Sequence, residues 1–351
     1  MRYHMTQTNS NRIKWIDMAK GIAMLMVIAG HSIGYKGTPF EQQVIRGIFY
    51  SFHMPFFFML NGYTSRCPDS GKQLLAGLKK SFKRLMLPAY ILWGVLMLLP
   101  IYSRFHYTPL QLALSALYAS AVDYKLNGIT IPYFGFVWFL VSLFVLKNLY
   151  DLINYILKGK YMTWVSLGFS VIGIIIGKKL FLPFVIDISL ASMIFYHIGK
   201  MLKKKEFVFS AKKLCIAFVI WIGIYLTIFL GLQSYLDLAS RSHSILPFSY
   251  IAAIAGSLTC IYVCMYLCER SGRVMDFVTD QLSFIGLNSM TLYAIHYLDM
   301  IWFSSVLLST NNQYLHLLVR AAEDVGLLYV VVYMMKKFRE RKKDPGSKKA
   351  Q

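Results

Sequence analysis

The stretch that decides the fold runs from Arg12 to Ser32 and reads R-I-K-W-I-D-M-A-K-G-I-A-M-L-M-V-I-A-G-H-S. It opens with basic residues and an aspartate, and from Ile16 to Gly34 it is apolar over a length that can cross a bilayer. His31 lies near the far end of this run. An ionisable side chain inside a membrane is energetically costly, so this histidine is a functional-site hypothesis from the outset.

The composition of the whole chain is that of a helical membrane protein. Of its 351 residues, 57% are hydrophobic and 15% are charged, whereas soluble domains carry about 25% charged residues. We therefore predict an all-α, polytopic integral membrane protein with about ten transmembrane helices. The candidate spans are 16–34, 44–62, 85–103, 134–153, 162–177, 180–199, 214–232, 246–268, 282–300 and 315–335. They form one predicted membrane domain at 16–335, between an N-terminal segment at 1–15 and a basic tail at 336–351.

The positions of the Lys and Arg residues predict the orientation of these spans. If the N-terminus is cytoplasmic, only eight of the 37 Lys and Arg residues fall in segments on the outer side. The positive-inside rule then places both termini in the cytoplasm. Because the residues behind the net charge of +21 lie at the ends of spans, they indicate membrane topology and no nucleic-acid partner.

Two more histidines lie within apolar spans. His53 is followed closely by Pro55, which we expect to kink the helix and shape a cavity. In the predicted topology His31, His53 and His296 lie at a similar depth in the outer half of the membrane, where three imidazoles can line one cavity. The alternative is that each neutral ring is satisfied by a backbone carbonyl or a hydroxyl group. Asp17 lies 14 residues before His31, or about 21 Å along a helix, so these two side chains cannot form a catalytic pair.

A second group of candidate residues is basic and lies at the predicted cytoplasmic ends of the first and third spans. One interpretation is anchoring of the helices by the positive-inside rule. The other is a pocket for a phosphorylated ligand held by charge-assisted hydrogen bonds. The residues concerned are Arg12, Lys14, Lys80, Lys83 and Arg84.

The five cysteines do not form a disulfide framework. Cys260, Cys264 and Cys268 recur every four residues and therefore line one face of a helix. A soft-metal site is one interpretation, but a stripe of small apolar residues at a helix contact is the one we favour.

Several of these segments resemble one known family, the membrane-bound acyltransferase-3 family. The run from Arg12 to His31 is similar to its first helix, and S-F-H-M-P-F-F-F at 51–58 is similar to its second. The resemblance continues through K-R-L-M-L-P at 83–88, W-F-L at 138–140 and L-N-S-M-T-L-Y-A-I-H at 287–296. The resemblance covers nearly the whole chain, and the sequences of these segments are most similar to the branch named for fucose 4-O-acetylase.

This resemblance implies an activity. A member of the family transfers an acyl group, usually acetyl from acetyl-CoA, to a hydroxyl of a surface glycan or of its lipid-linked precursor. The resemblance further implies that His31 is essential, that Arg12 and Arg84 serve the donor, and that the chain lies in a bacterial plasma membrane. The sequence departs from the family at Asn61, where serine is common, and at Lys80 and Lys83, which replace arginines. Lysine keeps the charge but loses the bidentate geometry that suits phosphate.

These elements combine into a mechanistic hypothesis. Acetyl-CoA, as donor substrate and with no permanently bound cofactor, places its phosphates at the basic residues, and His31 acts as general base on the acceptor hydroxyl. A covalent acyl-histidine relay is a variant. His53, Asn288 or Tyr293 orient His31 or donate to the developing oxyanion, and Tyr133 and Trp138 stack on the sugar. The rival hypothesis is a glycan transporter or flippase in which the histidines relay protons.

Overall fold

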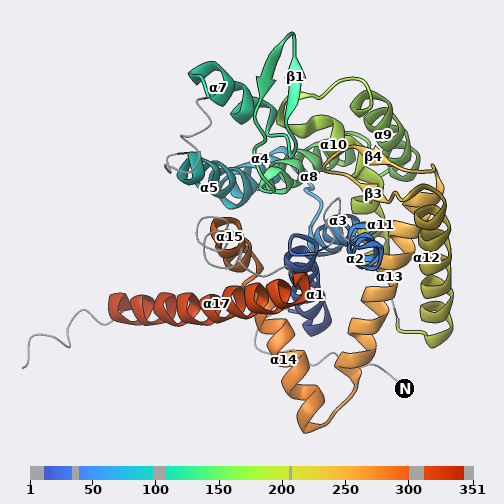
Figure 1. Ribbon diagram of the computed structural model, residues 1–351, viewed down its shortest axis with the longest axis vertical. Coiled ribbons are helices and arrows are strands. Elements are labelled where there is room, and N and C mark those ends of the chain that lie inside the picture. Colours follow the sequence, from blue (N-terminus) through green and yellow to red (C-terminus); the bar gives the residue numbers. More distant parts are fainter. Residues whose placement is uncertain (1–11, 34–38, 98–106, 205–207, 300–311, 344–351) are drawn as a thin grey trace, which may run out of the picture.

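The computed structural model describes residues 12–33, 39–97, 107–204, 208–299 and 312–343. Over these residues the chain is a bundle of helices with two short β-hairpins (Figure 1). Helix α1 (Lys14–Gly30) lies near the centre of the bundle and packs against α3 (His53–Thr64), α13 (Phe248–Glu269) and α14 (Arg273–Leu287). The predicted all-α class is therefore confirmed.

Glycines set the closest helix contacts around α1. A Cβ atom on Gly21 would overlap the carbonyl oxygen of Leu282, and one on Gly286 would overlap the carbonyl oxygen of Asp17. The α3–α11 crossing is built in the same way, with Gly62 and Gly199 facing backbone carbonyls of the partner helix. Such close approach of two backbones is what small residues permit in membrane helices.

The predicted second span is two helices rather than one kinked helix. Helix α2 (Phe40–Tyr50) ends before Ser51, and α3 begins at His53. Pro55 does not cause the break, which corrects our expectation. It lies in the first turn of α3, where backbone N–H groups have no partner within the helix, so a proline costs little there. Ser51 covers the break by donating to the carbonyl oxygen of Ile48 (2.8 Å) and accepting from Trp221 Nε1 (3.0 Å).

Two other predicted spans are also interrupted. The segment 180–199 consists of a 3₁₀ turn (Pro183–Val185), α10 (Ile186–Ala191) and α11 (Met193–Lys204), with a bend of 55°. The segment 282–300 is divided at Asn288 between α14 and α15 (Ser289–Asp299). Breaks of this kind place helix ends at membrane depth, which is tolerated where they border a cavity.

The helix of the third predicted span starts earlier than its apolar run. Helix α4 (Gly71–Ser81) leads through a π-helical turn, η1 (Phe82–Met86), into α5 (Leu87–Met97). A π turn inside an α-helix is rare and often lies at a functional site. Here it carries Lys83 and Arg84.

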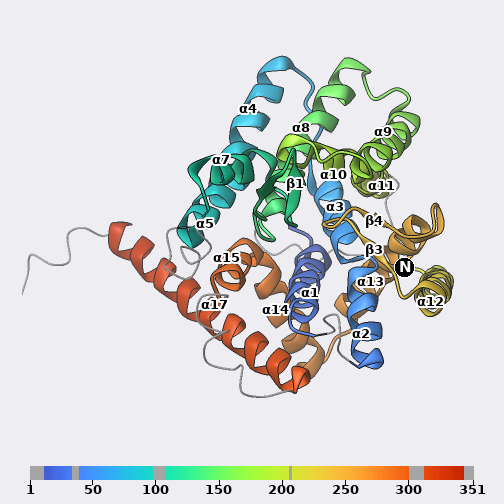
Figure 2. The same ribbon diagram turned by 45° about the horizontal axis from the view of Figure 1, so that its top comes forward.

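One hairpin lies beside a short helix, α7 (Pro109–Tyr118), and the other lies towards α12 (Ala211–Leu232) (Figure 2). Helix α7 is followed by the antiparallel pair β1 (Tyr124–Leu126) and β2 (Ile129–Ile131), and β3 (Leu236–Asp237) pairs with β4 (Ser242–His243). A buried ion pair ties the second hairpin to α10, because Arg241 Nε lies 2.7 Å from Asp187 Oδ2.

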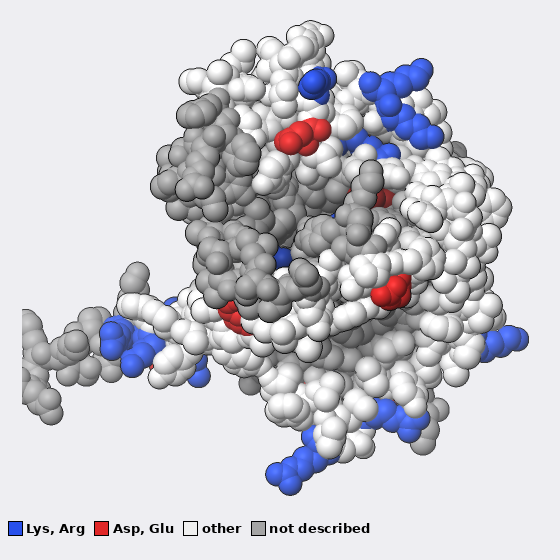
Figure 3. Space-filling model, viewed as in Figure 1, with Lys and Arg blue, Asp and Glu red and all other residues white. Residues whose placement is uncertain are grey.

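Three described helices are long and apolar enough to cross a membrane, namely α8 (Trp138–Ile156), α12 (Ala211–Leu232) and α13. The bent α10–α11 pair makes a fourth, and α9 (Met162–Gly177) is apolar but shorter. Large uncharged areas separate the Lys and Arg side chains on the face shown in Figure 3. The number of spans and the sidedness of the termini stay predictions. Helix α17 (Gln313–Lys343) continues without a break past position 335, where we expected the tail to begin.

The cysteine stripe on α13 packs as a helix contact. Cys264 is fully buried, and the sulfur of Cys268 lies 3.6 Å from that of Met18 on α1.

Candidate functional site

A single elongated cavity follows one face of α1. Its volume is about 1080 Å³, which is slightly more than the range of about 300–1,000 Å³ for sites that hold drug-sized ligands. Side chains at helical spacing from Asp17 through Lys20, Met24 and Val27 to His31 form one wall. Further walls come from α3, from α4 with η1, and from α8, α11, α14 and α15.

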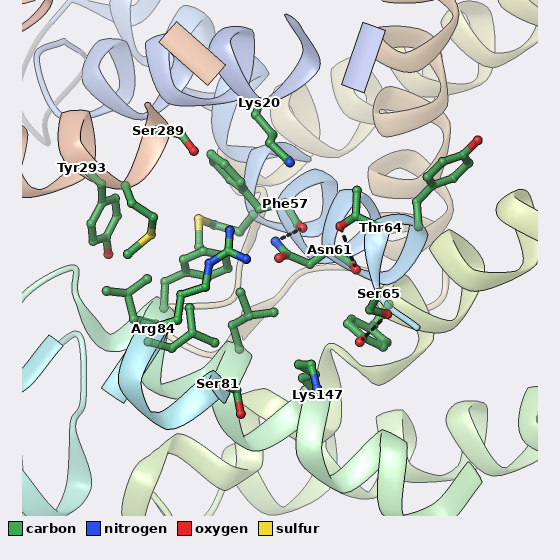
Figure 4. Close-up of a pocket in the computed structure, with 18 of the residues that line it drawn as sticks. Lys20, Phe57, Asn61, Thr64, Ser65, Ser81, Arg84, Lys147, Ser289 and Tyr293 are labelled. Carbon is green, nitrogen blue, oxygen red and sulfur yellow. Dashed lines mark hydrogen bonds between the residues drawn. The ribbon is translucent and has the colours of Figure 1, made fainter. Parts of the chain in front are cut away.

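One end of the cavity is strongly basic. Seven Lys and Arg residues line it together with only two carboxylates, Asp17 and Asp151. In Figure 4, Lys20 and Arg84 reach into the same space from opposite walls, and Lys147 lies on a further side. The seven residues are Arg12, Lys20, Arg66, Lys80, Arg84, Lys147 and Lys203. We call this group the basic end; it is suited to an anion carrying several charges.

The structure places three of the five predicted donor residues in the basic end, Arg12, Lys80 and Arg84. Lys14 points elsewhere and pairs with Asp280 on α14 at 2.7 Å. Lys83 is exposed and does not line the cavity, because it points in a different direction from the adjacent Arg84 on the π turn. Sequence reasoning missed Lys20, Arg66, Lys147 and Lys203. Lys20 carried a usable signal, since it lies one turn from Asp17 on the face that leads to His31.

The three predicted histidines come together at the other end. The ring centroid of His31 lies 5.6 Å from that of His296 and 6.3 Å from that of Tyr50. Tyr50 in turn lies 4.8 Å from His53. His31 and His53 line the cavity, whereas His296 is completely buried behind His31 and is not among the lining residues.

The hydrogen bonding of His53 fixes where its proton lies. Nδ1 is 3.0 Å from the carbonyl oxygen of Phe49. A carbonyl can only accept, so Nδ1 carries the proton in the neutral ring and Nε2 is left as an acceptor. The sequence analysis left open that a backbone carbonyl satisfies the ring of His53. This is the case for Nδ1, and Nε2 is left available to a ligand.

His296 belongs to a buried charged cluster with Asp299, Asp324 and Arg320. Nδ1 of His296 lies 2.9 Å from Asp324 Oδ2 and 3.1 Å from Asp299 Oδ2. Arg320 makes two hydrogen bonds of 2.6 Å to the carboxylate of Asp299. All four side chains are at most 9% exposed. Sequence reasoning missed this cluster, although charged residues inside the apolar segment 315–335 were a signal for it.

The acyltransferase-3 family model, described as an acyltransferase domain, matches residues 13–334. The chain belongs to the acyltransferase-3 family. It is therefore a membrane acyltransferase, and the expected family membership is confirmed. None of the curated proteins compared with it matches the chain.

The remaining predicted residues of this acyltransferase divide into two groups. Tyr293 and Trp138 line the cavity, and the hydroxyl of Tyr293 donates to the carbonyl oxygen of Phe136. Asn288 and Tyr133 are not among the lining residues. The side-chain amide of Asn288 donates to the carbonyl oxygen of Phe284 on its own helix (2.9 Å), at the α14–α15 junction.

The cavity of the acyltransferase continues beyond the histidines to the β3–β4 hairpin. Asp237 and Ala239 of this hairpin line it, together with Tyr50. Tyr50 accepts a hydrogen bond from Arg46 (3.2 Å) and lies 5.5 Å, ring to ring, from Tyr235. An aromatic surface beside a carboxylate and a guanidinium is suited to a ligand rich in hydroxyl groups. We call this group the hairpin end.

Proposed function

We propose that this membrane acyltransferase transfers an acetyl group from acetyl-CoA to a hydroxyl of a cell-surface or exopolysaccharide sugar, with His31 as general base. One observation carries the proposal, namely that a single cavity joins the basic end to His31 and His53. CoA is a polyanion at one end and a thioester at the other, so it needs such a combination of sites. The family membership supplies the reaction class.

The length of the cavity suits an extended donor. Lys20 and His31 are 11 residues apart on α1, which corresponds to about 17 Å of helix. The phosphates of the donor bind at Arg12, Lys80 and Arg84, where Arg offers paired N–H groups to phosphate oxygens. The flexible arm of the donor then extends along the apolar wall at Met24 and Val27 towards His31.

The acceptor approaches from the hairpin end. Tyr50 and Trp138 offer aromatic faces to the sugar, and Asp237 offers a carboxylate to its hydroxyl groups. This places the acceptor hydroxyl between His31 and the thioester. We place the protein in the plasma membrane of a bacterium, with the basic end facing the cytoplasm and the hairpin end facing outward.

The chemical step needs only one base. His31 accepts the proton of the acceptor hydroxyl as its oxygen attacks the thioester carbonyl, and the resulting intermediate collapses with loss of the CoA thiolate. The proton held on His31 then neutralises the thiolate, so an ester and free CoA leave the site. In its neutral form His53 cannot donate from Nε2, so its role is to accept a hydrogen bond from the substrate and not to stabilise the oxyanion.

The test supplies membranes with acetyl-CoA labelled in the acetyl group and with a panel of glycan acceptors. We expect ester formation by the native chain and a loss of at least about 100-fold in His31→Ala. His197→Ala is the matched control, because that histidine is also buried but is bonded to Tyr150 and Thr163 away from the cavity. Unchanged ester formation in His31→Ala would contradict the base assignment. Glycan movement by native membranes without consumption of acetyl-CoA would favour the transporter hypothesis.

A further inference from the structure

The charged cluster beside His31 determines which ring nitrogen of His296 carries the proton. Two carboxylates, Asp299 and Asp324, face Nδ1 of His296. Ionised carboxylates only accept hydrogen bonds, so the proton of neutral His296 lies on Nδ1. Its Nε2 is fully buried and has no hydrogen-bond partner among the residues that the structure describes. This nitrogen is therefore an acceptor held ready within the protein.

Among the residues that the structure describes, the ring of His31 is a neighbour of His296 that can supply a donor to this nitrogen. The two imidazole centroids are 5.6 Å apart and the ring planes are inclined by 43°. At this separation a small rotation brings a ring nitrogen of His31 within hydrogen-bond reach of His296 Nε2. Catalytic hydrogen bonds are often long before substrate binds and shorten in the complex.

We propose that His296 is a positioning residue for His31. Asp324 and Asp299 keep the proton of His296 on Nδ1, so Nε2 accepts a hydrogen bond from one ring nitrogen of His31. The other ring nitrogen of His31 then carries a lone pair that faces the cavity, which is the form that a general base requires. The inference rests on the proposed function, because that function gives His31 its role as general base. The tautomer of His31 can be tested independently of that role.

Of the two carboxylates in the cluster, Asp324 is the one that can balance a positive charge on His296. Arg320 binds both oxygens of Asp299 and so neutralises that carboxylate. Asp324 has no such cation among the described residues, and its Oδ1 is buried without a partner. When His31 takes up a proton and passes one on to His296, the carboxylate of Asp324 balances the new positive charge. No proton leaves the network, and the reverse transfer restores it.

A cation site is the other interpretation of these residues. His296, Asp299 and Asp324 offer three ligand atoms within 4.8 Å of one another. However, both oxygens of Asp299 already accept hydrogen bonds from the guanidinium of Arg320, whose positive charge repels a divalent cation. The cluster is therefore a hydrogen-bond network that ends at His31.

Other charged or titratable groups also act on His31. Arg46 on α2, His53 on α3 and Arg320 on α17 surround it in addition to His296 on α15. They are present equally in native protein and in variants of Asp324, so a comparison of those variants isolates the part of the carboxylate.

The test measures the reactivity of His31 directly in the purified full-length chain. Diethyl pyrocarbonate acylates the lone pair of a neutral imidazole, and mass spectrometry gives the rate at each histidine, with His197 as internal reference. In Asp324→Asn the amide can donate to His296 Nδ1, which moves the ring proton to Nε2 and reverses the orientation of the His31 tautomer. We expect slower modification of His31, a fall of about 100-fold in kcat and an unchanged KM for acetyl-CoA. Asp324→Glu restores part of both.

Asp187→Asn is the matched control, because it alters another buried aspartate that pairs with an arginine. An unchanged rate of His31 modification in Asp324→Asn would overturn the proposal. Equal losses in Asp324→Asn, Asp324→Glu and Asp187→Asn, together with lowered thermal stability, would also overturn it, since they indicate a structural role only. If His31 is modified more slowly in Asp324→Asn than in the native chain, but the native chain forms no ester, the positioning role stands and the proposed function is contradicted.

Discussion

Arg320 on α17 donates a hydrogen bond of 3.0 Å from Nη1 to the main-chain carbonyl oxygen of His31 at the end of α1. The two residues are 289 positions apart in the chain. The same guanidinium is fixed by Asp299 on α15, so three helices meet where α1 ends. Residues from the last part of the chain thus hold the backbone at His31, which sequence order alone does not indicate.

The basic end makes a prediction that two adjacent residues separate. Arg84 lines the cavity and Lys83 does not. A charge-assisted hydrogen bond contributes about 1.5–3 kcal/mol, so Arg84→Ala should raise the KM for acetyl-CoA by about tenfold to 100-fold. Lys83→Ala should change it by less than about twofold. Initial rates at varied acetyl-CoA give both values, and equal effects of the two substitutions would contradict donor binding at the basic end.

The glycine crossing of α1 and α14 predicts a stability effect. Gly286→Ala places a methyl group against the carbonyl oxygen of Asp17, and neither backbone can move freely. We expect the free energy of unfolding to fall by about 1–3 kcal/mol or more, as in other overpacked sites. Gly223→Ala on α12 is the control, because a Cβ there meets nothing within 4 Å. Thermal unfolding in detergent measures both, and equal midpoints for the two variants would argue against the close crossing.

The ion pair between Arg241 and Asp187 predicts non-additive losses. Their side chains are 3% and 0% exposed, so removal of one partner leaves a buried charge. Arg241→Leu should lower the free energy of unfolding by about 3–5 kcal/mol. The double variant with Asp187→Leu should recover part of that loss, because no unpaired charge remains. Chemical unfolding of the single and double variants tests this, and strictly additive losses would contradict it.

The β3–β4 hairpin predicts a dependence of stability on pH. Burial, together with the positive charges of Lys178 and Arg241, lowers the pKa of His243 to about 4. In the unfolded chain a histidine titrates at about 6.5. Between these pH values the unfolded chain binds a proton that the folded chain does not, so the free energy of unfolding decreases as the pH falls. In His243→Gln this decrease should be smaller, and an unchanged pH dependence of thermal unfolding would contradict the assignment.

The sequence predicted the features that depend on local pattern. The apolar run before His31 forms a buried helix. The positions of the spans predicted similar depths for the three histidines, and in the structure they lie close together. We did not predict Lys20, but the same periodicity carried a signal for it, since it lies on the face of α1 that leads to His31.

Features that depend on tertiary contacts could not be predicted in this way. The break before His53 is covered by Trp221 from α12, a residue that no local pattern connects with it. Lys14 and Lys83 have the right charge and depth, but their directions are set by Asp280 on α14 and by the π turn. The partners of Asp324 and Arg320 depend on the packing of α17 against α1 and α15, which no pattern within 315–335 indicates.

The most direct test of the account asks whether a donor held at the basic end reaches His31. Bromoacetyl-CoA carries an electrophilic carbon beside the thioester carbonyl, and it can alkylate a nucleophile at that position. Cys67 also lines the cavity, so the experiment uses the full-length Cys67→Ser protein. We predict alkylation of His31, detected by mass spectrometry, that acetyl-CoA prevents and Arg84→Ala weakens. Absence of label on His31, or labelling that acetyl-CoA does not reduce, would contradict the account.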